Sequence, residues 1–96
     1  MFAIEFGENG DILCSGRLDA SQCAKAQGFM DSVSGPSVLD FDRLEYISSA
    51  GLGMLLKTQK RLVKGGAALK IINVNHHIHD VFRYSGFHAI FEIEAQ

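Results

Sequence analysis

The segment from Ser49 to Lys64 has the clearest periodicity in the chain, and it constrains the fold most. Its apolar residues recur at helical spacing and fall on one face of an α-helix. That face comprises Leu52, Leu55, Leu56, Gln59, Leu62 and Val63, and Lys57, Lys60, Arg61 and Lys64 fall mainly on the other, solvated side. Gly65–Gly66 follows as a C-terminal cap. The sequence therefore predicts an amphipathic helix that buries one face against the rest of the fold.

Short apolar segments with strand character alternate with helical segments along the whole chain. The patterns predict strands at residues 2–6, 11–15, 38–41, 68–72 and 91–93, and helices at residues 20–32, 49–64 and 74–84. Residues 7–10 are turn residues that join the first two strands as a hairpin, and Gly16 is expected to end the second strand. This order predicts an α/β fold with a mixed, mostly parallel sheet of about five strands and helices packed against it.

The first expected helix has a weaker signal than the second. Asp19 precedes it as an N-cap, and Gly35–Pro36 ends it. Its buried face is expected to contain Ala20, Cys23, Ala24, Gln27 and Met30.

Length and charge exclude several classes of protein. The 96 residues suit one domain spanning positions 1–96, and the net charge of −2 argues against a nucleic-acid binder. No apolar run is long enough to cross a membrane, and the N-terminus lacks the features of a signal peptide. We therefore expect a cytoplasmic protein, in which Cys14 and Cys23 are small buried or half-buried residues.

The stretch Tyr46–Gly53 is the least ordinary part of the sequence. Two serines stand directly before the amphipathic helix, and two glycines occupy its first turn, where each costs about 1 kcal/mol relative to alanine. One interpretation is structural: Ser48 caps the helix, and Gly51 and Gly53 allow close packing. The other is a phosphorylation switch, because a phosphate at a helix N-terminus adds about −1.5 to −2 charges at a site that favours anions.

Three segments of the chain resemble the STAS domains, in particular the stand-alone bacterial anti-sigma factor antagonists. Residues 40–56, with Ser48-Ser49-Ala50-Gly51-Leu52-Gly53 at their centre, are similar to a strand, Asp-Ser-Ser-Gly-Leu-Gly and a helix. Residues 15–19 are similar to the family's Gly-Glu-Leu-Asp turn, and residues 81–87 to its Leu-Phe-x-x-Ser-Gly-Leu segment. The sequence departs from the pattern where Ser48 replaces an Asp and Ala50 replaces a Ser or Thr.

The resemblance implies a protein-binding switch that catalyses nothing itself and has no cofactor. Ser49 matches the phosphorylated serine, and Asp19 matches an acidic residue near the docking surface of the partner kinase. The implied partners are an anti-sigma factor that is also a serine kinase, and a metal-dependent serine phosphatase. The implied partner-binding residues are Asp19, Ser48, Ser49, Ala50, Gly51 and Gly53.

The sequence also leaves other functions open. A constitutive STAS adaptor that docks on a transporter ATPase is the main alternative, and an anion or nucleotide sensor at the same helix start is another. His76, His79 and Asp80 share a helical face, but no second cluster completes a metal site, so we expect no metal. The sequence has no G-x-S-x-G elbow, S-x-x-K motif or P-loop, so we expect no catalytic residues.

Overall fold

The computed structural model describes all residues, 1–96, and contains one five-stranded sheet in the order β1-β2-β3-β4-β5. The chain runs through β1 (Phe2–Phe6), β2 (Ile12–Leu18), η1 (Ala20–Gln22), α1 (Cys23–Met30), β3 (Ser37–Ile47), α2 (Ser49–Lys64), β4 (Leu69–Val74), α3 (His76–Ser85), η2 (Phe87–Ala89) and β5 (Glu92–Ala95). Strand β1 is antiparallel to β2, and every other neighbouring pair is parallel. The predicted α/β fold with a mixed, mostly parallel sheet is confirmed.

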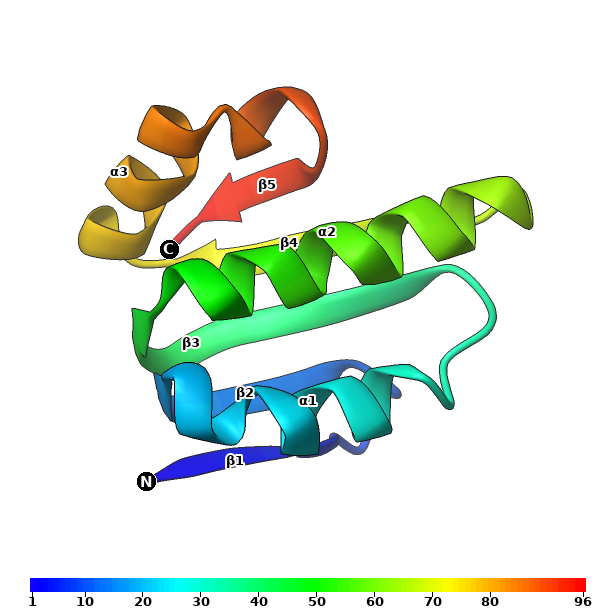
Figure 1. Ribbon diagram of the computed structural model, residues 1–96, viewed down its shortest axis with the longest axis horizontal. Coiled ribbons are helices and arrows are strands. Elements are labelled where there is room, and N and C mark those ends of the chain that lie inside the picture. Colours follow the sequence, from blue (N-terminus) through cyan, green and yellow to red (C-terminus); the bar gives the residue numbers. More distant parts are fainter.

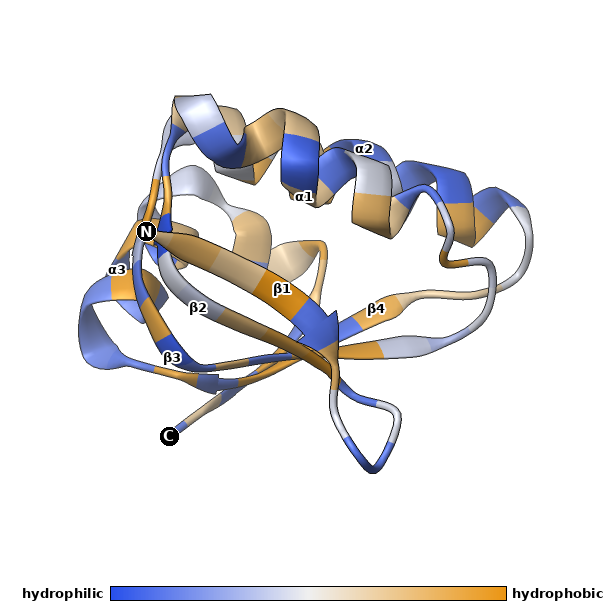
Figure 2. Ribbon diagram, turned by 90° about the horizontal axis from the view of Figure 1, so that it is seen from below, coloured by the Kyte–Doolittle hydropathy of each residue, from blue (hydrophilic) through white to orange (hydrophobic).

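Helices α1 and α2 lie side by side over one face of the sheet (Figure 1). Figure 2 shows both helices on the same side of the strands, with apolar residues along the strands beneath them. Along β3, Leu39 and Phe41 are buried toward this layer, whereas Asp42 is exposed. Helix α3 joins the same core, because the ring of its buried Phe82 lies 6.3 Å from that of Phe41.

Strand β2 runs past the point where the sequence predicts its end. Gly16 lies inside the strand, pairs with Phe2 and has a φ of +82°. A Cβ atom at Gly16 would lie 1.9 Å from the carbonyl oxygen of Met1, the residue before β1, so the neighbouring backbone leaves no room for a side chain. The prediction that Gly16 ends the strand is wrong because this glycine serves a close backbone approach within the sheet. Strand β3 is also longer than predicted and continues to Ile47.

The first helix differs most from its prediction. Residues 20–22 form a 3₁₀ turn and the α-helix begins only at Cys23, so the helical phase changes within the segment. The buried residues are Ala26 and Met30, and Ala20 and Ala24 of the expected face are exposed. Alanine and glutamine carry little hydrophobic signal, which explains why their spacing does not identify the buried side.

Helix α2 has the predicted bounds, but its buried face is rotated from the predicted one. Leu55, Gln59 and Leu62 are buried as expected, Leu52 and Leu56 are half-buried, and Val63 is 55% exposed. Met54 and Thr58 are also buried, although the predicted face omits them, and so is Gly51, for which close packing was one interpretation of the sequence.

Two polar side chains of α2 connect it to neighbouring elements. The amide of Gln59 accepts a hydrogen bond from the Leu69 N–H at 2.8 Å and donates one to the Ile90 carbonyl at 3.1 Å. The Arg61 guanidinium donates to the Met30 carbonyl at the end of α1, at 2.8 Å. Arg61 is exposed, as predicted, and its hydrogen bond also connects α2 to the end of α1.

The two cysteines are free thiols in the positions expected for small residues of a packed domain. Cys14 is buried and Cys23 is half-buried. Burial, with a smaller effect from the Asp40 carboxylate, raises the pKa of Cys14 to about 12. Its thiol therefore stays protonated at neutral pH, and the stability that depends on the neutral thiol would decline only as the pH rises above 9.0, the ordinary pKa of a cysteine thiol.

Candidate functional site

One edge of the sheet brings together the starts of the helical segments. The parallel strands β2, β3 and β4 end there and lead directly into η1, α2 and α3 (Figure 1). Leu18 and Ile47, the last residues of β2 and β3, are paired in register, and the Ser48 N–H donates to the Leu18 carbonyl at 2.9 Å. This hydrogen bond holds the loop carrying Ser48 and Ser49 against the loop carrying Asp19.

The two serines at the start of α2 have different environments. Ser48 is the half-buried N-cap, and its hydroxyl oxygen accepts a hydrogen bond from the Gly51 N–H at 3.1 Å. Ser49 is the first residue of the helix and is exposed, and its hydroxyl makes no hydrogen bond within the chain. The cap and the candidate phosphoacceptor are therefore separate residues, and only the Ser49 hydroxyl is unengaged.

The two glycines of the first turn also differ. Gly51 is buried, and a Cβ there would lie 2.9 Å from Cγ1 of Ile47 and 3.0 Å from Cγ of Leu18. Gly53 is exposed, and a Cβ there would meet nothing within 4 Å. Gly51 thus lets α2 approach the ends of β2 and β3 closely, whereas Gly53 and Ala50 lie on the exposed side of the helix start.

Alanine substitutions should separate these two glycines by the sign of their effect on stability. Gly53→Ala should raise the free energy of unfolding by up to about 1 kcal/mol, because alanine favours the helix and fits open space. Gly51→Ala should lower it by up to about 2 kcal/mol, because overpacking against Ile47 and Leu18 exceeds the same helical gain. Urea denaturation measures both changes. Equal effects would contradict the packing described for Gly51.

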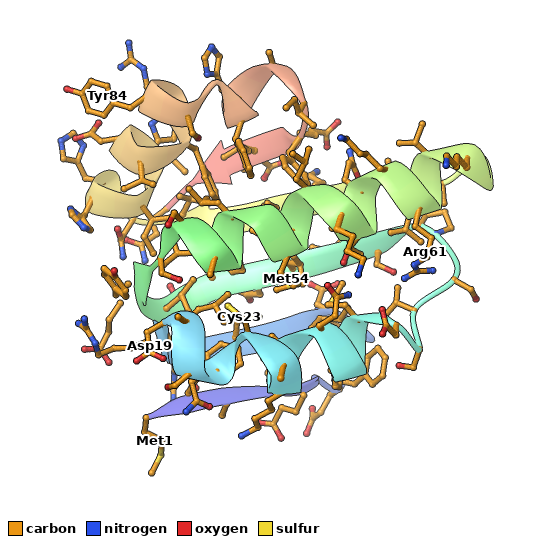
Figure 3. The ribbon with its side chains drawn as sticks, viewed as in Figure 1. Met1, Asp19, Cys23, Met54, Arg61 and Tyr84 are labelled. Carbon is orange, nitrogen blue, oxygen red and sulfur yellow. The ribbon has the colours of Figure 1, made fainter.

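Asp19 lies at the same edge, as the N-cap of η1 rather than of an α-helix (Figure 3). Its carboxylate accepts from the Ser21 hydroxyl at 2.6 Å and from the Ser21 N–H at 3.1 Å. The Ser21 hydroxyl, backbone N–H groups and the Arg17 charge lower the pKa of Asp19, so the carboxylate is ionised at neutral pH. The predicted N-cap role is confirmed for the 3₁₀ turn, and the structure places the charge next to the loop that carries Ser49.

Sequence reasoning missed a pair of side chains at this edge. The exposed Arg17 of β2 lies over the ring of Tyr46 of β3, with the guanidinium carbon 4.3 Å from the ring centroid. Arg17 and Tyr46 are paired in the parallel register of β2 and β3. The signal available in the sequence was the Arg at a position where the similar family turn has a Glu.

Helix α3, which carries the histidines, begins at the same edge of the sheet. Asn75 caps α3 by accepting from the Ile78 N–H at 2.9 Å, and its side-chain amide donates to the Leu44 carbonyl at 3.0 Å. His76 lies 3.4 Å from the Asp80 carboxylate, between Nε2 and Oδ2. The structure contains no group of three or more His, Cys, Asp or Glu residues arranged to hold a metal ion. None of its helices is long and apolar enough to span a membrane.

The fold and the site define a small α/β domain with a mixed five-stranded sheet and an exposed serine at the first residue of its second helix. A family model described as "Mlab, STAS domain" matches residues 6–92, which is most of the chain. The chain therefore belongs to the STAS domain family.

Comparison with individual proteins agrees with this membership. The chain is 43% identical over 56 residues to a Bordetella bronchiseptica protein described as anti-sigma factor antagonist BtrV, and the match covers 58% of this chain and 48% of that protein. The matched segment thus spans about half the length of this relative.

Solved structures share the fold at low sequence identity. SpoIIAA, an anti-sigma factor antagonist solved in its unphosphorylated form, superimposes with a TM-score of 0.78 at 18% identity, covering 100% of this chain and 89% of that one. A Thermotoga maritima protein described as an anti-sigma factor antagonist gives a TM-score of 0.79 at 14% identity, covering 99% of this chain and 86% of that one. The chain therefore has the STAS fold of the anti-sigma factor antagonists.

Proposed function

We propose that the chain is a phosphorylation-controlled switch that binds an anti-sigma factor in its unphosphorylated state. In this proposal the partner is also the serine kinase that phosphorylates Ser49, and phosphorylation releases it. A metal-dependent serine phosphatase resets the switch. The domain itself catalyses nothing. Its partner-binding surface comprises Asp19, Ser48, Ser49, Ala50 and Gly53, and the buried Gly51 supports this surface from beneath by letting α2 approach the strands.

The observation that carries the proposal is that the two serine hydroxyls have different hydrogen bonding. Ser48 uses its hydroxyl to cap α2, while Ser49 is exposed and makes no hydrogen bond with its own. A kinase can therefore phosphorylate the Ser49 hydroxyl without disrupting the helix cap at Ser48. Two solved forms of SpoIIAA, phosphorylated and unphosphorylated, show that a protein of this fold exists in both states.

The physical effect of the phosphate is local. At the N-terminus of α2 the helix dipole favours a negative charge by about 0.3–1 kcal/mol, so phosphorylation should leave the fold intact. In a contact with a partner, the same charge of about −1.5 to −2 must be desolvated and meets the ionised Asp19 carboxylate at the same edge. A cost of a few kcal/mol is enough to reverse binding of moderate affinity.

Phosphorylation of the purified protein tests the proposed acceptor. The partner is first captured from lysate of the source organism and identified, and it is then incubated with this protein and ATP. We expect one phosphate on Ser49 by mass spectrometry, none on Ser49→Ala, and continued phosphorylation of Ser49 in Ser48→Ala. Phosphate on Ser48 of the Ser49→Ala protein at the wild-type rate would show that the wrong serine was assigned.

The second candidate function is a constitutive adaptor that docks on a transporter ATPase. The observation that favours it is the departure from the switch pattern, because Ser48 replaces an Asp and Ala50 replaces a Ser or Thr beside the acceptor. In that case Ser49 is only the first residue of α2, and ATP does not release the partner. Identification of a transporter ATPase in the capture experiment would support the adaptor.

A further inference from the structure

The guanidinium of Arg17 stacks on an aromatic ring at the rim of the candidate site. Arg17 lies on the exposed surface at the end of β2, and its guanidinium carbon is 4.3 Å from the centroid of the Tyr46 ring. Because the two residues are paired in the β2–β3 register, the sheet itself sets their relative position. A guanidinium stacked on an aromatic ring keeps the edge that carries its N–H groups available to a partner.

The side chain of Arg17 has no hydrogen-bonding partner within the chain. The backbone N–H of Arg17 donates to the Met1 carbonyl at 2.9 Å, and no hydrogen bond involves its guanidinium. Arg61 provides the contrast, because its guanidinium donates to the Met30 carbonyl and so has a structural role. The stacking on Tyr46 thus orders a side chain with five N–H donors that the fold does not use.

The position of Arg17 connects it to the proposed switch. The next residue, Leu18, accepts the hydrogen bond from the Ser48 N–H, and Asp19 follows it. The Arg17 charge also lowers the pKa of the Asp19 carboxyl, so the guanidinium lies near Asp19, and a protein that binds over Asp19 has Arg17 and Tyr46 within its reach. Arginine and tyrosine are the residue types enriched among the energetically dominant residues of protein interfaces.

We propose that Arg17, held on Tyr46, determines which partner the site accepts by forming a bidentate ion pair with a carboxylate side chain of that partner. The proposal rests on the proposed function only in that the site binds a protein. A flat guanidinium with two parallel N–H groups matches the two oxygens of a carboxylate. Where the similar family turn has Glu, a partner surface suited to that negative charge would meet a positive one here, which gives discrimination by charge.

Affinity measurements on arginine variants test the role of the charge and of the planar group. Using the captured and identified partner, we expect Arg17→Ala to raise the Kd at least about tenfold, Arg17→Lys to recover only part of the affinity, and Arg17→Glu to bind most weakly. Arg43→Ala is the matched control, because Arg43 is exposed on β3 and also makes no side-chain hydrogen bond. It should change the Kd less than twofold.

Variants of Tyr46 test whether the ring acts through Arg17. Tyr46→Phe keeps the ring and should bind like the wild type, whereas Tyr46→Leu should weaken binding. In the Arg17→Ala background, Tyr46→Leu should have no further effect. A purely structural role for Tyr46 would instead weaken binding equally in both backgrounds, which would contradict the positioning role.

Substitutions in the partner identify the carboxylate. Each exposed Asp or Glu of the partner is changed to Asn or Gln, and one of these changes should weaken wild-type binding while leaving the binding of Arg17→Ala unchanged. Wild-type affinity of Arg17→Ala, or the absence of any coupled carboxylate, would overturn the proposal. Failure of the switch is measured separately, as the absence of ATP-driven release, and the Arg17 result stands in either case.

Discussion

Leu55→Ala should lower the free energy of unfolding by about 2–5 kcal/mol, the range for removing most of a buried leucine side chain. Leu55 lies in the middle of α2, is 1% exposed and belongs to the cluster that joins the helices to the sheet. Alanine keeps the helical propensity, so the loss comes from the cavity and from the transfer free energy of the missing methyl groups. Urea denaturation monitored by circular dichroism measures the change.

Val63→Ala is the matched control on the same helix. Val63 is 55% exposed, so its truncation should change the free energy of unfolding by less than about 0.5 kcal/mol. Lys60→Ala, another exposed change, should also have an effect of that size. Losses of similar size for Leu55→Ala and Val63→Ala would mean that the helix is rotated from the orientation described.

The comparison of Leu55 with Val63 also shows how far sequence reasoning reaches. Periodicity identified α2 and its bounds because a long amphipathic helix has a strong local signal. It could not choose between Val63 and Met54 for the buried face, because both are apolar and only the packing partners decide which is covered. The order of strands and helices was sufficient to predict the class of fold, since parallel strands require helical connections.

Features that depend on contacts between distant segments were not predictable. Gly16 looked like a strand terminator because the carbonyl that approaches it belongs to Met1, a residue distant in the sequence. The candidate site followed the same rule: Ser48 and Ser49 were visible as a local motif, whereas the Arg17–Tyr46 stack exists only through strand pairing. The burial of Gly51 was expected from its cost to the helix, but its neighbours Ile47 and Leu18 were not.

Substitution of Ser49 by aspartate should weaken partner binding at least several-fold without unfolding the domain. The carboxylate lies at the first residue of α2, where the helix dipole favours negative charge by about 0.3–1 kcal/mol. In the proposed contact it replaces an exposed neutral hydroxyl with a charge at the edge that already carries Asp19. Because a carboxylate has less charge than a phosphate, the loss should be smaller than that caused by phosphorylation.

The measurement compares wild type, Ser49→Ala and Ser49→Asp against the identified partner by isothermal titration calorimetry, with circular dichroism as the control for folding. A switch requires that Ser49→Ala bind like the wild type and remain bound when ATP is added, while ATP releases the wild type. Ser48→Asp provides a matched charge one residue earlier, at the cap, where aspartate can still accept the Gly51 N–H.

The pattern across these variants separates the two candidate functions. If the charge at position 49 weakens binding more than the charge at position 48, and only Ser49 confers release by ATP, the contact surface is centred on the first residue of α2, and a phosphate there controls it. If all variants bind alike and ATP releases none of them, the surface around Ser49 lies outside the interface. The adaptor hypothesis then holds, in which Ser49 is the first residue of α2 and has no regulatory role.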